Sequence, residues 1–117
     1  MFGFLKNLFN SEKLYTDVTT DTFKTMMTNK NVIIVDVRTP NEYKSGKIGK
    51  AKNINVASFD FMNSVKDLDK SKDLLIYCRS GVRSARACKM VTKLGFEKVY
   101  NLKGGIMAWQ NHGNKVG

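Results

Sequence analysis

The residues best suited to chemistry in this chain surround a single cysteine. The apolar run Leu74–Tyr77 is typical of a buried strand, and it ends at Cys78. A short glycine-containing loop follows, flanked by Arg79 and Arg83, and a helix-like segment begins at Ser84. Parallel α/β sheets place ligands at the carboxyl ends of their strands. Because a helix N-terminus offers unpaired backbone N–H groups to negative charge, we expect a thiolate at this cysteine and an anion in the loop.

The reactivity expected of Cys78 depends on its protonation. A free cysteine has a pKa near about 8.5, and neighbouring arginines or a helix N-terminus lower this pKa. Arg79, Arg83 and the helix start at Ser84–Ala85 are expected to supply that effect. Cysteine is often simply a small buried residue, but the flanking charges and the strand–loop–helix context favour a nucleophile. We therefore predict Cys78 to be the catalytic residue.

The loop itself is predicted to form a cradle. The backbone N–H groups of Ser80, Gly81 and Val82 are expected to point inward, toward an anion or a persulfide. A tight cradle needs backbone angles that glycine tolerates, which suits Gly81.

Two other residue types narrow the chemistry. Cys88 lies on the apolar face of the expected helix and is interpreted as core, with a regulatory Cys78–Cys88 disulfide as the alternative. The only histidine is His112, so a Cys–His dyad would require it to fold back over the loop. A Cys-x-x-Cys redox pair is absent. An ionised cysteine needs no base when the leaving group is stable, as sulfite is, and this favours sulfur transfer over peptide hydrolysis.

Composition limits the remaining possibilities. The 117 residues, 42% of them hydrophobic, suit one globular domain. Two cysteines exclude a disulfide framework or a four-thiolate site, so we expect no metal or other cofactor and a reducing cytoplasm. The net charge of +10 comes mostly from dispersed lysines, which favours a solvated surface over a nucleic-acid partner.

The elements that must position this loop alternate along the chain. Thr39, Pro40 and Glu42 form a capping-box pattern at one helix start. Alternating strands and helices predict a parallel sheet with helices on both faces. The expected strands are Tyr15–Val18, Val32–Val37, Asn53–Val56, Asp73–Tyr77 and Val99–Leu102. The expected helices include one capped by Thr19, Thr20 or Asp21 with an apolar stripe at Phe23, Met26 and Met27, then Ser58–Leu68, Ser84–Leu94 and a short one carrying Ile106 and Trp109.

The two ends of the chain are expected to lie outside the folded domain. Residues 1–13 are expected to be an N-terminal extension, either loose or a short amphipathic helix, and we expect no membrane contact through Met1–Phe9. Residues 113–117 are expected to be a loose tail. The remaining residues, 14–112, form the predicted domain.

Four segments in order resemble the rhodanese family. Cys78–Arg83 matches the family's six-residue loop Cys-Arg-x-Gly-x-Arg. Val35–Tyr43 resembles its first signature, Gly46–Ile54 resembles its Gly-His-Ile-x-Gly-Ala-x-Asn-Ile segment, and Gly104–Trp109 resembles its C-terminal signature. The resemblance extends from about Tyr15 to Trp109, nearly the whole domain.

This resemblance implies a three-layer α/β/α domain with a five-stranded parallel sheet in the order 1-5-4-2-3. It implies that Cys78 takes a sulfane sulfur from a small anionic donor, thiosulfate or a persulfide, and passes it to a thiol, to cyanide or to a protein acceptor. Asp36 and Arg38 would be structural, pairing with charges near the loop. The loop residues that would bind the substrate are Arg79, Ser80, Gly81, Val82, Arg83 and Ser84.

Two alternatives remain open. Phosphatases and arsenate reductases on the same fold carry a Cys-x5-Arg loop, one residue longer than the Cys78–Arg83 loop here. A sulfur carrier or sensing module without turnover is the other alternative.

Overall fold

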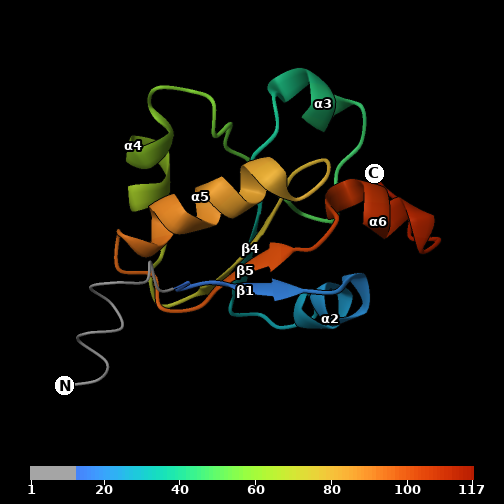
Figure 1. Ribbon diagram of the computed structural model, residues 1–117, viewed down its shortest axis with the longest axis horizontal. Helices are drawn as coiled ribbons and strands as arrows, with labels where there is room; N and C mark the ends of the chain where they lie inside the picture. Colours follow the sequence, from blue (N-terminus) through green and yellow to red (C-terminus); the bar gives the residue numbers. More distant parts are fainter. Residues whose placement is uncertain (1–12) are drawn as a thin grey trace.

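Strands and helices alternate as the sequence predicts, and they build one sheet covered on both faces (Figure 1). The computed structural model describes residues 13–117. The N-terminal extension predicted for residues 1–13 therefore lies almost wholly outside the described residues. Within residues 13–117, no helix is long and apolar enough to cross a membrane.

The sheet has five strands in the order β1-β5-β4-β2-β3, and every neighbouring pair is parallel. This confirms the predicted fold class and strand order. Parallel neighbours bring the carboxyl ends of the central strands to one edge of the sheet. The strands are β1 Thr16–Val18, β2 Val32–Asp36, β3 Lys52–Asn53, β4 Asp73–Tyr77 and β5 Val99–Leu102.

The helices begin at side-chain caps or at glycines. Thr19 caps α2 by accepting a hydrogen bond from the Thr22 N–H. Thr39 and Glu42 form the predicted capping box at the start of α3. Glycines in the left-handed region, with φ of +101° and +79°, precede α5 and α6. The helices are α2 Thr20–Met26, α3 Pro40–Lys44, α4 Phe61–Lys66, α5 Val82–Thr92 and α6 Gly105–Asn111.

Two apolar clusters hold the layers together. On one face, β-strand residues pack with Phe61 of α4 and Val91 of α5. On the other face, Phe23 of α2 and Trp109 of α6 pack with Tyr77. Figure 1 shows α5 and α2 on opposite sides of the strands. The central strands are mostly apolar because both of their faces are buried.

Several segments differ from the sequence prediction, among them the third strand, α4 and the C-terminal residues. The third strand was expected at Asn53–Val56 but covers Lys52–Asn53, and α4 is shorter than the expected helix. Beyond β3, the chain stays against β2 through hydrogen bonds from the backbone N–H groups of Ile54 and Val56. Residues 113–117, predicted to be loose, exchange two backbone hydrogen bonds with Lys47 through Gly117.

A buried ion pair closes the carboxyl end of β2. The Arg38 guanidinium donates to both carboxylate oxygens of Asp36, with Nη2 2.6 Å from Oδ2. Arg38 also donates to the Gly46 carbonyl, and Asn53 donates to the Asp36 and Arg38 carbonyls. The two charged residues thus pair with each other, which corrects the expectation that they pair with charges near the loop.

Asp36→Asn tests this pair, because it leaves the Arg38 guanidinium buried without a countercharge. We expect the free energy of unfolding in urea to fall by about 3–5 kcal/mol. The control is Asp67→Asn, an exposed carboxylate, which should change it by no more than about 0.5 kcal/mol. Equal effects of the two substitutions would contradict the assignment.

Candidate active site

Cys78 follows the last residue of β4 and stands at the carboxyl edge of the sheet, next to the start of α5. The strand ends here because the chain turns at Gly81, whose φ of +101° lies in the left-handed region. Helix α5 begins immediately afterwards, two residues earlier than predicted. The side chain of Cys78 is buried, with 1% of the residue exposed. The predicted cysteine is therefore held beneath a tight turn, at a helix N-terminus.

Hydrogen-bond donors surround the sulfur. The Gly81 N–H lies 3.1 Å from Sγ, and the Ser84 hydroxyl donates to Sγ from 3.3 Å. Burial opposes ionisation, but hydrogen bonds from the Ser84 hydroxyl and from the N–H groups of Ser84, Gly81 and Ser80 outweigh it, so the pKa of Cys78 lies below its ordinary value. These donors at the helix start, one of the two causes that the sequence suggested, stabilise the thiolate more than the arginines do.

A second helix start supports the loop from behind. The Ile106 N–H donates to the Cys78 carbonyl at 2.9 Å, and the Met107 N–H donates to the Arg79 carbonyl at 3.1 Å. A side chain at Gly105 would overlap the Arg79 backbone, so glycine is required at this close approach. The backbone of α6 thus fixes the outer half of the loop.

The two loop arginines have different surroundings. Arg83 forms a bidentate pair with Glu42 of α3, at 2.8 and 2.9 Å. Hydrogen bonding from Arg83 is the main reason that the pKa of Glu42 falls to about 2. Arg79 is exposed, and within residues 13–117 its side chain forms no ion pair. The Arg79 guanidinium is therefore left without a carboxylate partner in this part of the chain, whereas Arg83 ties the loop to α3.

The remaining predicted loop residues divide in the same way. Ser84 is fully buried and directed at the sulfur, whereas the Val82 side chain is 76% exposed and contacts solvent. Ser80 is exposed, and its backbone N–H is the part that supports the sulfur. The structure therefore brings the loop's backbone together around Cys78 and leaves most of its side chains outside.

Sequence reasoning did not identify two residues that position the loop. Glu42 was assigned only to the capping box, because its pairing with Arg83 spans 41 residues. Asn101 of β5 is buried and donates to Asp17 and, at 3.4 Å, to the Gly81 carbonyl. A polar residue in the middle of the strand Val99–Leu102 was the available signal for it.

The other candidate groups lie apart from the sulfur. Cys88 is buried on α5, both cysteines are free thiols, and burial raises the pKa of Cys88. His112 is at the end of α6 away from the loop, with Nδ1 2.8 Å from the Ala108 carbonyl. Among residues 13–117, no cluster of three metal-ligating side chains exists. Cys78 is therefore the only one of these candidate groups that the loop's hydrogen-bond donors surround within residues 13–117.

Comparison with known proteins places this arrangement in one family. The model of the Rhodanese-like domain matches residues 19–112. A sulfurtransferase of Allochromatium vinosum is 40% identical over 84 residues, which cover 72% of this chain and 77% of that protein. A rhodanese-related protein of Thermoplasma volcanium has a crystal structure with a TM-score of 0.77 and 28% identity, covering 88% of this chain and 98% of that one.

The same domain also occurs within longer proteins. A tRNA uridine(34) hydroxylase of Cytophaga hutchinsonii is 37% identical over 90 residues, and the match covers 74% of this chain but 29% of the hydroxylase. The similarity therefore concerns only part of that enzyme.

Ser84→Ala tests the source of the thiolate. Loss of the hydroxyl donor raises the pKa of Cys78, so the midpoint of its alkylation rate against pH moves upward. The rate is measured by intact mass after iodoacetamide treatment. Ser80→Ala is the matched control, because it keeps the Ser80 backbone N–H and should leave the midpoint unchanged. An unchanged midpoint in Ser84→Ala would contradict the hydrogen-bond account.

Glu42→Gln tests the anchor through its pH dependence. The folded-state pKa of Glu42 is depressed, so the pairing with Arg83 adds stability fully above about pH 4.5 and loses it as pH falls toward about 2. The difference in unfolding free energy between the parent protein and Glu42→Gln should shrink over this window in urea titrations. The exposed Glu97→Gln serves as control, and a pH-independent difference for Glu42→Gln would contradict the pairing.

Proposed function

The chain belongs to the rhodanese-like domain family of sulfurtransferases, and we propose that it moves a sulfane sulfur through a persulfide on Cys78. The observation that carries this proposal is a buried sulfur ringed by the Ser84 hydroxyl and the N–H groups of the loop. Donors of this kind stabilise an anion in a dry site. The same donors can stabilise the attacking thiolate of the first half-reaction and the persulfide anion that persists until the second.

The first half-reaction takes sulfur from thiosulfate. The Cys78 thiolate attacks the outer sulfur, a new S–S bond forms, and the bond between the two sulfurs of thiosulfate breaks. The electron pair of that bond leaves with sulfite, and the cysteine becomes a persulfide anion. No proton is transferred, which agrees with His112 lying at the distant end of α6.

The second half-reaction discharges the persulfide. A thiolate or cyanide attacks the terminal sulfur, and the Cys78 thiolate is the leaving group. The same hydrogen bonds that lower the thiol's pKa stabilise this leaving group. Cyanide would leave as thiocyanate, and a thiol acceptor would leave as its own persulfide.

The side chains around the opening give the loop its selectivity. Arg79 is exposed beside the cysteine, where its charge can meet the sulfite end of the donor. Arg83 is engaged by Glu42 and holds the loop's shape. With four residues between Cys78 and Arg83, the loop is one residue shorter than the loops of phosphatases on this fold and favours a sulfane sulfur over a tetrahedral oxyanion.

The test is intact mass after incubation with thiosulfate. The parent protein and Cys88→Ser should each gain one sulfur atom, and cyanide should remove it with release of thiocyanate. Cys78→Ser should gain none, because it lacks the attacking sulfur. Sulfur uptake by Cys78→Ser would overturn the assignment, as would turnover of an aryl phosphate with no persulfide, which would favour a phosphatase.

A further inference from the structure

Among residues 13–117, no strand covers the edge of the sheet along the amino half of β2. Strand β3 begins at Lys52, opposite Val35, so in the described part of the chain no strand lies beside the residues of β2 before Val35. The Asn31 carbonyl and the Val37 N–H bond to the β4 side. Because backbone direction alternates along a strand, the N–H and carbonyl of Val32 and the N–H of Ile34 point toward the open edge, whereas the Ile34 carbonyl faces the start of β3 at Lys52. An open edge of this kind is a template for another extended chain.

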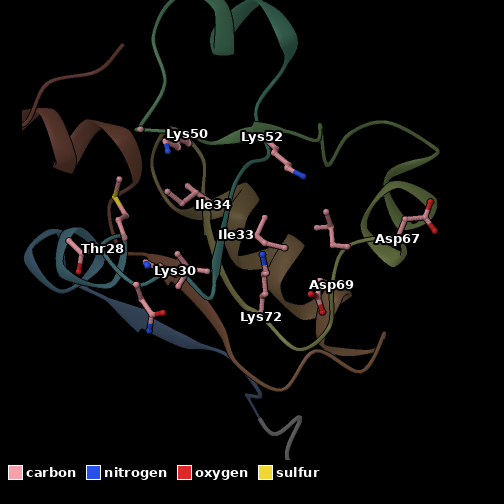
Figure 2. Close-up of a pocket in the computed structure, with 14 residues that line it drawn as sticks. Thr28, Lys30, Ile33, Ile34, Lys50, Lys52, Asp67, Asp69 and Lys72 are labelled. Carbon is pink, nitrogen blue, oxygen red and sulfur yellow. The ribbon is translucent and has the colours of Figure 1, made fainter.

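This edge is the floor of a groove of about 710 Å³. One wall is the end of α2 and the turn after it, and the other is the connection between α4 and β4. Figure 2 shows that Ile34 and Ile33 point to opposite sides of the edge. A strand added here would therefore place alternate side chains against the two walls.

The two walls differ in charge. Lys30 and Lys50 stand on the side of Ile34, and no carboxylate lines that side (Figure 2). On the side of Ile33, the lysines share the wall with carboxylates; these groups are Lys52, Lys72, Asp67 and Asp69. A bound strand with an anionic residue at every second position would meet Lys30 and Lys50, and no carboxylate among the described lining residues, on the Ile34 side.

The charges also decide among occupants. Lysines beside an open edge disfavour pairing with the same edge of a second copy of the chain. A second copy also carries the same +10 charge, which opposes its binding. A nucleic-acid backbone would satisfy the lysines, but it offers no N–H donors to the strand edge and would meet Asp67 and Asp69. An extended acidic peptide satisfies both the backbone and the lysines.

We propose that this groove binds an extended acidic segment of a partner protein, which adds to β2 as an edge strand with carboxylates facing Lys30 and Lys50. The groove lies beside the amino half of β2, whereas Cys78 follows the carboxyl end of β4, its neighbour in the sheet. A docked segment therefore leaves the thiol open. The proposal concerns binding alone and does not depend on the sulfur chemistry.

The test uses the full chain labelled with ¹⁵N and a capped peptide of alternating valine and glutamate. Titration should shift the amide resonances of Val32 and Ile34 saturably. Lys30→Glu combined with Lys50→Glu should weaken binding by about tenfold or more, because two attractions become repulsions. The matched control, Lys44→Glu with Lys89→Glu, makes the same charge change on lysines that do not line the groove and should weaken binding by less than about threefold.

Three further outcomes would overturn the proposal. A peptide with lysine in place of glutamate should not bind, and equal binding would exclude charge complementarity. A peptide methylated at alternate backbone nitrogens should lose affinity, and unchanged affinity would exclude strand addition. Tighter binding of single-stranded oligouridine at the same resonances would identify a nucleic-acid site instead. Thermal unfolding of each variant confirms that a lost signal is not lost folding.

Discussion

A buried sulfur anion is costly unless hydrogen-bond donors surround it, and the loop after β4 is organised around this cost. The N–H groups that face Cys78 come from a turn that requires Gly81 in the left-handed region and from the first turn of α5. The Ser84 hydroxyl, inside that turn, completes the set. Moving any of these donors outward would leave the burial of Cys78 uncompensated and favour the neutral thiol.

Donors can be held this closely only if the loop cannot relax, and two rigid elements prevent relaxation. The first N–H groups of α6 bind the Cys78 and Arg79 carbonyls, an approach that the absence of a side chain at Gly105 permits. The bidentate pair between Arg83 and Glu42 ties the other end of the loop to α3. The α3 capping box uses the same Glu42 carboxylate, so one side chain both starts a helix and anchors the site.

Local patterns predicted much of this. The apolar runs identified all five strands, and the family resemblance supplied their order in the sheet. The strand–loop–helix pattern placed Cys78 correctly at the carboxyl edge of the sheet. The roles of the arginines could not be predicted from local patterns, because Arg83 pairs with Glu42, 41 residues away in the sequence. The C-terminal tail was misjudged for the same reason: its composition is that of a loose end, but Gly117 pairs with Lys47.

The short length of β3 has consequences for both halves of β2. At the carboxyl end, the Asn53 side chain donates to the Asp36 and Arg38 carbonyls, beside the buried ion pair of β2. A longer strand toward the amino end would cover Val32 and Ile34 and fill the groove between α2 and α4. The short strand instead braces β2 near Cys78 and leaves its opposite half open, so the proposed sulfur-transfer site and the proposed peptide groove lie at separate parts of one small sheet.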